Sequence, residues 1–546
     1  MTTSVTPARL RLSVTFGILA LALLLRLPLA LDPGLTGDEV SNLLLARCAP
    51  RAQLDGTALD PSNPPLDPLV LHAVRAVGGE RLWLLKLVGV AANLATIALL
   101  MALAQRWAGA TAALLTGLLV AVNPWHVYLA TELRGYALLG FWAAAAFLCA
   151  DRFARDGRRT AALAWALAIA AACWTHYSGV VLGLATGVYG LHAAWRRQRD
   201  AKIPAANKPG AHTGRDARTR PGRDVAVWLG CAALAIALAA LWLPQMAKQD
   251  IQAGGRPEAW WHLFGTPAVQ AVGTMLLRPE VGKRWLALGT AATLLIFGVP
   301  FAAGAWRLAR TRRDALLLIA GLLGLAVCVP LARSAAIGSL SFSTRYTFIA
   351  SGGVLILLAT GLAALPSRVR WVAAIGVLAL STVALAQMYR TRAGRDFGAE
   401  PFARAAAEVP DGDAFLFPQL SRAFHARYFQ PRRWPRAYVE GGSAERAGFV
   451  PSDATFENYT LAMRDPAGYY TGAWAASLRR HRAVWYWQEG TGDEPPALLG
   501  RAYRPDRAVM LVAPGSFGHE TQIRLVRWVR DAAPAGATSS SLPGAP

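Results

Sequence analysis

Cysteine is scarce in this chain of 546 residues, which has five: Cys48, Cys149, Cys173, Cys231 and Cys328. No cysteine follows residue 390, so the part of the chain beyond it must be held together by a hydrophobic core rather than by disulfides. The spacing of cysteine and histidine matches no zinc site. A glycine-rich phosphate-binding loop is also absent, which argues against a nucleotide substrate.

Hydrophobic residues are abundant instead and make up 54% of the chain, more than one soluble core needs. The sequence therefore predicts an integral membrane protein. Apolar windows of about 20 residues, the length that crosses a bilayer as a helix, predict eleven spans. They lie near residues 10–31, 82–104, 109–123, 133–150, 160–176, 177–195, 225–244, 284–305, 314–332, 346–365 and 371–389.

Basic residues set the orientation, because they collect on the cytoplasmic side of a membrane protein. With the N-terminus inside, the basic inner loops are 105–107, 151–159, 196–223, 307–313 and 368–370. Much of the net charge of +23 lies in these loops, where it faces the anionic lipids of the cytoplasmic leaflet. Nucleic acid is therefore not an expected partner. The first span should stay as an anchor, because Arg26 interrupts it and no convincing cleavage pattern follows.

The outer loops are then 32–81, 124–132, 245–283 and 333–345, and the odd number of spans places the chain beyond residue 390 outside the cytoplasm. We divide the chain into a membrane module of residues 1–389, an extracytoplasmic α/β domain of residues 390–531 and a disordered tail of residues 532–546. The inner loop 196–224 is also predicted to be disordered. The α/β class follows from helical segments at 400–409 and 420–429 and strand-like segments at 414–418, 483–487 and 509–513.

Two adjacent carboxylates, Asp38 and Glu39, follow directly on the first predicted span. Either they cap a helix over residues 40–47, since anions suit a helix N-terminus, or they serve chemistry. In a catalytic role, one carboxylate would take a proton from a hydroxyl while the other orients a metal, an amine or a sugar. The same loop contains Asn63-Pro64-Pro65-Leu66, predicted to turn before an apolar helix over residues 69–77 that could lie along the membrane surface.

A second group of candidates lies in residues 123–136, between two predicted spans. Glu132 and Arg134 are either a self-neutralising pair or a carboxylate and guanidinium directed at a polar ligand. The aromatic and histidine side chains suit an interfacial belt. They are Trp125, His126, Tyr128 and Tyr136.

Two further candidates lie at the same predicted face. His176 stands between two spans with almost no loop, where it is either an interfacial hydrogen-bonding group or a ligand. Arg345, followed by Tyr346, lies just outside the tenth predicted span. An arginine at that level either binds a lipid phosphate bidentately or extends to the headgroups.

Taken together, these positions resemble the GT-C superfamily of polyprenyl-phosphate-dependent glycosyltransferases, in particular the bacterial branch of protein O-mannosyltransferases and aminoarabinose transferases. The resemblance runs over most of the chain and depends on the order of short motifs and on an external C-terminal domain. The motifs are Asp38-Glu39, Pro64-Pro65-Leu66, Glu132-Leu-Arg134-Gly-Tyr136, His176-Tyr177-Ser-Gly179 and Arg345-Tyr346. The family often has histidine before the paired prolines, where this chain has Asn63, so a first-loop histidine role is in doubt.

The resemblance implies a hexosyl- or pentosyltransferase at the outer face of the bacterial inner membrane. It would move a sugar, with inversion, from a polyprenyl-phosphate donor to a hydroxyl of a protein, lipid or wall-glycan acceptor. Asp38 would be the general base, and Arg134 and Arg345 would bind the donor phosphate. Glu39 and Glu132 would position the acceptor, the sugar or a divalent ion.

The remaining implied positions concern substrate and metal. Substrate would also be positioned by Tyr136, His176 and Tyr346. The one cofactor to consider is a divalent ion, Mg²⁺ or Mn²⁺, at Asp38 and Glu39. In the C-terminal domain, Trp485, Tyr486 and Trp487 either stack on sugars or form a strand core.

Two other classes of protein remain open from the sequence. A transporter or flippase of lipid-linked glycans would also need carboxylates, and many small residues in the spans would permit helix sliding. The absence of detectable inverted repeats and the position of the charged candidates on one face disfavour it. A receptor that senses cell-wall lipid is the third reading, and no residue favours it.

Overall fold

The structure is a computed structural model of the chain. It describes residues 7–55, 63–201, 223–246, 283–337, 344–392, 399–410, 413–417, 425–426, 428–430, 437–439, 448–450, 481–489, 503–514 and 520–530. The chain forms two compact units. The first comprises Met1–Asp32 and Ala46–Thr391, and the second comprises Pro33–Leu45 and Arg392–Pro546.

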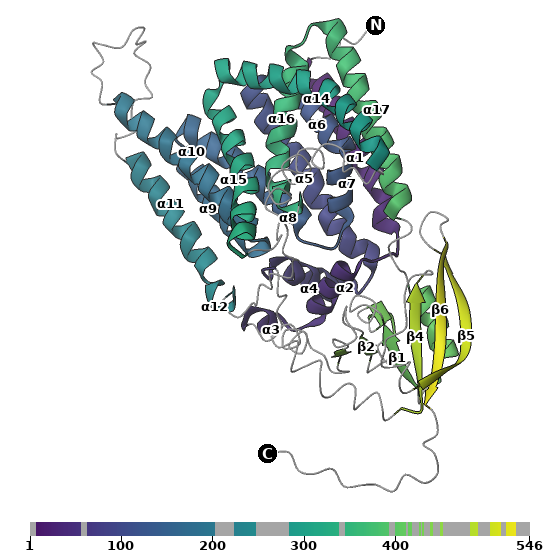
Figure 1. The fold of residues 1–546 in the computed structure, drawn as a ribbon. Helices are drawn as coiled ribbons and strands as arrows, with labels where there is room; N and C mark the ends of the chain where they lie inside the picture. The colour runs from purple at the N-terminus through teal and green to yellow at the C-terminus, as the bar shows by residue number, and fades with distance from the viewer. Residues whose placement is uncertain are drawn as a thin grey trace, which may run out of the picture. The chain divides into compact units, whose positions relative to one another are not determined.

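The first unit is helical (Figure 1). Its helices begin with α1 (Pro7–Leu31), α3 (Pro50–Asp55), α4 (Leu66–Gly78), α5 (Leu82–Ala108), α6 (Ala110–Val122), α7 (Pro124–Thr131), α8 (Tyr136–Asp156) and α9 (Arg159–Thr175). They continue with α10 (Ser178–Ala201), α11 (Arg223–Ala240), α12 (Leu243–Met246), α14 (Lys283–Thr311), α15 (Arg313–Ile337), the 3₁₀ turn η2 (Thr344–Thr347), α16 (Phe348–Ala364) and α17 (Ser367–Arg392). Each of the eleven predicted apolar segments coincides with one of these helices.

Within the described residues, six helices are long and apolar enough to cross a membrane. They contain Arg11–Leu31, Leu82–Ala108, Tyr136–Asp156, Arg313–Ala332, Arg345–Ala364 and Ser367–Tyr389. The pair α6 and α7, bent by 58°, makes a seventh candidate if it is one broken span, while α9 and the apolar part of α11 are shorter. The chain is therefore an integral membrane protein, and the count of eleven spans stays a prediction.

Two predicted loops contain more structure than the sequence indicated. The segment 124–132, expected to be a short turn, is helix α7 up to Thr131, because Asn123 caps it through a hydrogen bond to the His126 N–H and Pro124 suits its first turn. The first predicted loop contains α3, α4 and α2 (Gly37–Arg47), which confirms the helices expected over 40–47 and 69–77.

Helix α16 is buried along its length, from Phe348 to Leu362, as expected of a helix that is apolar on every side. It lies against α14 with small residues between them. A Cβ added to Gly361 would overlap the carbonyl oxygen of Pro300, and one added to Gly304 would overlap that of Leu357. Glycine at these two positions allows the backbones to approach, as in other helix pairs within membranes.

We therefore expect Gly361→Ala to lower the free energy of unfolding by about 1–3 kcal/mol, the usual cost of overpacking. The matched control is Gly321→Ala in α15, where an added Cβ would meet no atom within 4 Å. That control should be neutral or slightly stabilising, because alanine is the better helix former. Thermal unfolding of the purified proteins makes the comparison, and equal midpoints would contradict the packing.

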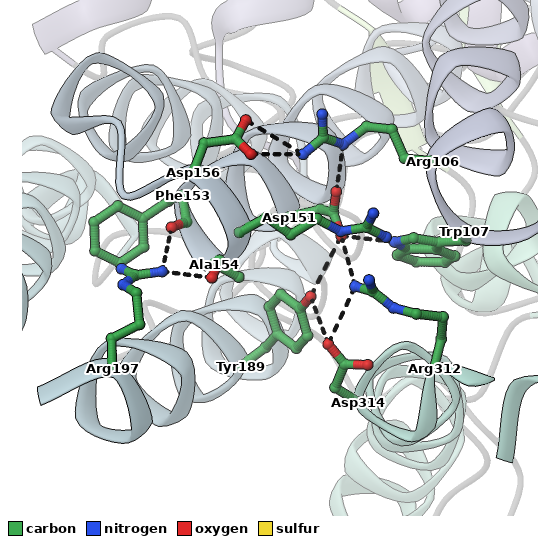
Figure 2. A network of polar contacts seen from close by, with 11 residues as sticks. Arg106, Trp107, Asp151, Phe153, Ala154, Asp156, Tyr189, Arg197, Arg312 and Asp314 are labelled. Atoms are coloured by element: carbon green, nitrogen blue, oxygen red, sulfur yellow. Dashed lines mark hydrogen bonds and ion pairs between the residues drawn. The ribbon is translucent and has the colours of Figure 1, made fainter. Parts of the chain in front are cut away.

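At the other end of α8 from Tyr136, the buried carboxylate of Asp151 joins several helices (Figure 2). It pairs with Arg106 at 2.6 Å, Arg155 at 3.1 Å and Arg312 at 3.6 Å. It also accepts hydrogen bonds from Trp107 Nε1 at 2.8 Å and from the Tyr189 hydroxyl at 3.5 Å. The partners come from α5, α8, α10 and the connection between α14 and α15. Asp151 therefore holds this end of the bundle together.

Asp151→Asn should destabilise the protein by about 3–5 kcal/mol, because it leaves three guanidinium groups around a neutral amide. The control is Asp200→Asn, whose carboxylate is exposed and lies 3.9 Å from Arg199. An exposed pair of this kind contributes about 0–1 kcal/mol. Thermal unfolding and the yield of folded protein should separate the two variants clearly.

The second unit contains helix α18 (Glu400–Glu408) and a six-stranded sheet. The strands are β1 (Ala414–Phe417), β2 (Ala437–Val439), β3 (Gly448–Val450), β4 (Ala483–Glu489), β5 (Tyr503–Pro514) and β6 (Glu520–Arg530), in the order β3-β2-β1-β4-β6-β5. Strand β1 is parallel to β2 and β4, and the other pairs are antiparallel.

The strands predicted over 414–418, 483–487 and 509–513 and the helix over 400–409 are confirmed. Most of the helix predicted over 420–429, the inner-loop residues 202–222 and the tail 532–546 lie outside the described residues.

The aromatic residues of β4 form the core of the second unit. Trp485, Tyr486 and Trp487 are each at most 2% exposed. The ring of Trp487 stacks on Phe402 of α18, with centroids 4.9 Å apart. The alternative that these side chains stack on sugars is therefore wrong.

In the same unit, the His425 Nε2 lies 2.7 Å from the carbonyl oxygen of Leu35, which holds the segment 33–45 to this unit.

Candidate functional site

Asp38 and Glu39 occupy the first turn of α2 and belong to the second unit. The Thr36 N–H donates to Glu39 Oε2 at 2.8 Å, and the Glu39 N–H donates to Thr36 Oγ1 at 3.3 Å. This reciprocal pair is a capping box. Glu39 is buried, whereas Asp38 is exposed at the same helix N-terminus. The capping alternative thus describes Glu39, and Asp38 is the accessible carboxylate of the pair.

The other predicted site residues lie in the first unit, and the structure brings them together. Glu132 follows the last residue of α7 and is fully buried. Arg345 stands in η2, and its Nη1 lies 3.5 Å from Glu132 Oε1. The guanidinium carbon of Arg345 is also 5.8 Å from the centre of the Tyr136 ring, within reach of a cation–π interaction. The Arg345 side chain remains 30% exposed, so it is accessible to a ligand while it pairs with Glu132.

Three rings form a row beside this ion pair. The centroid of His176 lies 5.6 Å from that of Tyr136 and 5.6 Å from that of Tyr346. The Ser178 N–H donates to His176 Nδ1 at 3.1 Å, so this nitrogen carries no proton. We therefore assign His176 as neutral, with its proton on Nε2. In this state the ring donates one hydrogen bond and carries no charge.

Arg134 completes the group from the short connection between α7 and α8. It is half-buried, and its charge lies close enough to act on Tyr136 and His176. The adjacent Gly135 allows a close approach, because an added Cβ would meet Thr175 Cγ2 at 2.8 Å. Two guanidinium groups, one buried carboxylate and three rings therefore meet where α7, α8, α9 and η2 begin or end.

The aromatic-belt alternative for the second motif is wrong. Trp125, His126, Tyr128 and Tyr136 are all buried. They pack against neighbouring helices, because α7 lies among α1, α5, α6 and α8. Hydropathy places such residues at the right depth, but it does not show whether a side chain faces lipid or protein.

Three polar residues near this end of the bundle were not predicted as candidates. Asp67 in the first turn of α4 is buried, and its Cβ would lie 3.4 Å from a Cβ added to Gly135. Its position directly after Pro64-Pro65-Leu66 is the feature of the sequence that could have identified it as a candidate. Lys86 of α5 is buried and donates to the carbonyl oxygen of Asp32 at 2.6 Å. Asn93, about two helical turns further along the same face of α5, is buried as well.

These features define a class of protein: an integral membrane protein that is a helical bundle with a cationic, aromatic group at one end. Residues 62–206 match the family model for dolichyl-phosphate-mannose-protein mannosyltransferases. That stretch contains Glu132, Arg134, Tyr136 and His176. No curated protein matches the chain.

The fold is similar to two solved structures of ArnT from Cupriavidus metallidurans. The apo form is 14% identical with a TM-score of 0.58, and the match covers 94% of this chain and 97% of that one. The form bound to undecaprenyl phosphate is 15% identical with a TM-score of 0.55, and the match covers 97% and 99%. At this identity the likeness shows the fold. The resemblance predicted from the sequence motifs, to GT-C proteins of the PMT-like and ArnT-like branch, is confirmed.

Proposed function

We propose that the protein is a membrane glycosyltransferase that moves a sugar from a polyprenyl-phosphate donor to an acceptor hydroxyl. The observation that carries the proposal is the Glu132–Arg345 ion pair, which stands beside three rings at one end of a GT-C-like bundle. A structure with the same fold contains undecaprenyl phosphate, a lipid phosphate of the kind that the reaction releases.

Charge explains why this end of the bundle suits the donor. A polyprenyl phosphate leaves as an anion, so the transition state gains negative charge on the phosphate oxygens. Arg345 is oriented by Glu132 on one side and accessible on the other, and Arg134 adds a second positive charge. Fixed cations that face developing negative charge are a large source of catalysis. A phosphate leaving group needs little protonation, so these cations matter more than a general acid.

The rings position the sugar in this proposal. His176 donates a hydrogen bond to a sugar hydroxyl through its Nε2–H and, being neutral, does not repel the arginines. Tyr136 and Tyr346 flank it: the half-buried Tyr346 presents a ring face to the sugar, and the buried Tyr136 supports Arg345 and His176 from behind. Because His176 Nδ1 already accepts the Ser178 N–H, this residue is not the base that deprotonates the acceptor.

Asp38 is the general base in this proposal. Glu39 caps α2 and Glu132 pairs with Arg345, whereas Asp38 is exposed. Its carboxylate takes the proton of the acceptor hydroxyl as the hydroxyl oxygen attacks the anomeric carbon and the bond to the phosphate breaks, with inversion. The reaction is placed at the outer face of the bacterial inner membrane, with the second unit outside the cytoplasm. The acceptor is a protein, a lipid or a wall glycan.

A divalent ion fits poorly at Asp38 and Glu39. Glu39 Oε2 already accepts the Thr36 N–H, and the described part of the chain has no group of three or more Asp, Glu, His or Cys that could hold a metal. We therefore expect EDTA to change the turnover rate by less than about twofold, since the arginines supply the positive charge. A large loss that Mg²⁺ or Mn²⁺ restores would contradict this expectation.

Labelled sugar distinguishes this function from its alternative, a transporter of lipid-linked glycans. The protein is placed in sealed vesicles with a polyprenyl-phosphate donor whose sugar is labelled, and with protein, lipid and glycan acceptors. A transferase moves the label into one acceptor fraction. A transporter leaves the label on the lipid and changes only the leaflet in which it is found, and this result would overturn the proposal.

A further inference from the structure

A buried arginine compensates for the bend between α6 and α7. Pro124 has no N–H, so the Val120 carbonyl loses the donor that an unbroken helix would provide. Arg26 of α1 supplies replacements: its Nη2 donates to Val120 O at 3.3 Å and its Nη1 donates to Ala121 O at 3.0 Å. Inside a membrane an unsatisfied carbonyl is costly. Arg26 thus stabilises the bent geometry from which α7 departs.

Hydrogen bonds continue from Arg26 to α16. Arg26 Nε donates to Asn93 Oδ1 at 2.9 Å, and Asn93 Nδ2 lies 3.2 Å from His126 Nδ1. His126 Nε2 lies 3.1 Å from Ser351 Oγ, which donates to the Phe348 carbonyl at 2.6 Å. Arg26, Asn93, His126 and Ser351 are each at most 1% exposed.

The arginine fixes the direction of every bond in this series. A guanidinium only donates, so the Asn93 oxygen accepts and its NH₂ group must donate onward. The His126 Nδ1 then accepts, and its proton lies on Nε2 and points to Ser351. One arrangement of protons therefore satisfies the four side chains together, which makes the contact between α7 and α16 specific.

The segment of α7 with the residue after it and the segment of η2 and α16 are thereby joined at two levels. One level is the bond between His126 and Ser351, reinforced by the packing of the His126 ring on Phe348 at 4.7 Å. The other is the ion pair between Glu132 and Arg345. His126 and Glu132 are six residues apart in the chain, and so are Arg345 and Ser351. Two short stretches of chain therefore link the His126–Ser351 contact to the Glu132–Arg345 contact.

We propose that the buried series Arg26–Asn93–His126–Ser351 is a positioning device that holds Arg345 against Glu132 in the geometry that binds the donor phosphate. The inference depends on the proposed function, which assigns Arg345 to that phosphate. His126 and Ser351 are positioning residues, since they act through Arg345. Single interhelical hydrogen bonds in membrane proteins contribute little stability on average, so the main effect of this one is on geometry.

Ser351→Ala tests the proposal with a matched control in the same helix. Thr360 is also buried in α16 and its hydroxyl also donates to a carbonyl of its own helix, that of Ile356, at 2.8 Å. Thr360→Val therefore removes a comparable buried hydroxyl without touching α7. We expect Ser351→Ala to raise the donor KM and lower kcat/KM by about tenfold or more, as small displacements of binding groups do, while Thr360→Val stays near the wild type. Equal kinetics in the two variants would overturn the proposal.

Double mutants test whether Ser351 acts through Arg345. If it does, Ser351→Ala adds little to the loss caused by Arg345→Lys, because the two changes damage one unit. Losses that multiply would overturn the proposal.

The same test can be made without any substrate. We expect the loss of thermal midpoint from Ser351→Ala to be smaller in a Glu132→Gln background than in the wild type, and full additivity would overturn the two-level coupling. Coupling in this cycle together with no sugar transfer by the wild type would overturn the proposed function alone.

Discussion

Asp38→Asn should slow sugar transfer by orders of magnitude and leave donor binding intact. The exchange removes the base but keeps a polar side chain that suits the first turn of α2. General-base catalysis contributes about 10²–10⁴-fold, so kcat should fall by that factor. The donor KM should change little, because the donor phosphate is assigned to Arg134 and Arg345.

The measurement is steady-state release of polyprenyl phosphate by the variant and the wild type, with donor binding followed separately. Far-UV circular dichroism and the thermal midpoint show whether the variant is folded. Turnover of the variant equal to that of the wild type would rule Asp38 out as the base. A parallel loss of donor binding would instead assign Asp38 to the donor.

Arg345→Lys should weaken use of the donor without unfolding the protein. Lysine keeps a positive charge beside the buried Glu132, so it avoids leaving that carboxylate uncompensated. It loses the planar, bidentate recognition of phosphate that a guanidinium provides. Charge-assisted hydrogen bonds are worth about 1.5–3 kcal/mol, so kcat/KM for the donor should fall by about 10- to 100-fold.

A matched control is Arg368→Lys, at the start of α17, where the arginine is exposed. Helix α16 separates the two positions, with Arg345 just before its first residue and Arg368 just beyond its last. The control should behave as the wild type. If both variants lose activity equally, the loss comes from exchanging an arginine near the membrane surface in general, and Arg345 has no special role in the candidate site.

Sequence patterns predicted the helices of the first unit well, since each predicted span coincides with a helix. Long apolar runs leave few alternatives in a membrane, where every backbone group must be satisfied within the segment. The sequence predicted a turn at 124–132 rather than helix α7, and it did not show that Arg26, which is distant in sequence, supplies donors to the carbonyls at the bend. In the sequence, Arg26 stands out only as a charge within the first predicted span.

The sequence predicted which residues form the candidate site better than it predicted which of them are in contact. Glu132, Arg134 and Tyr136 are neighbours in sequence, but their meeting with His176 and Arg345 depends on how α8, α9 and η2 pack. The assignment of residues 33–45 to the second unit also depends on a long-range contact, between His425 and the Leu35 carbonyl. Hydropathy carries no information on such contacts, so the sequence placed Asp38 only at a membrane face.

The most direct measurement is the release of free polyprenyl phosphate by the wild-type protein in lipid vesicles. A panel of polyprenyl-phosphate sugars is supplied together with protein, lipid and glycan acceptors. We expect one donor to be consumed, with one polyprenyl phosphate released for each sugar that reaches the acceptor. No release from any donor, by folded protein with acceptors present, would contradict the assignment as a glycosyltransferase.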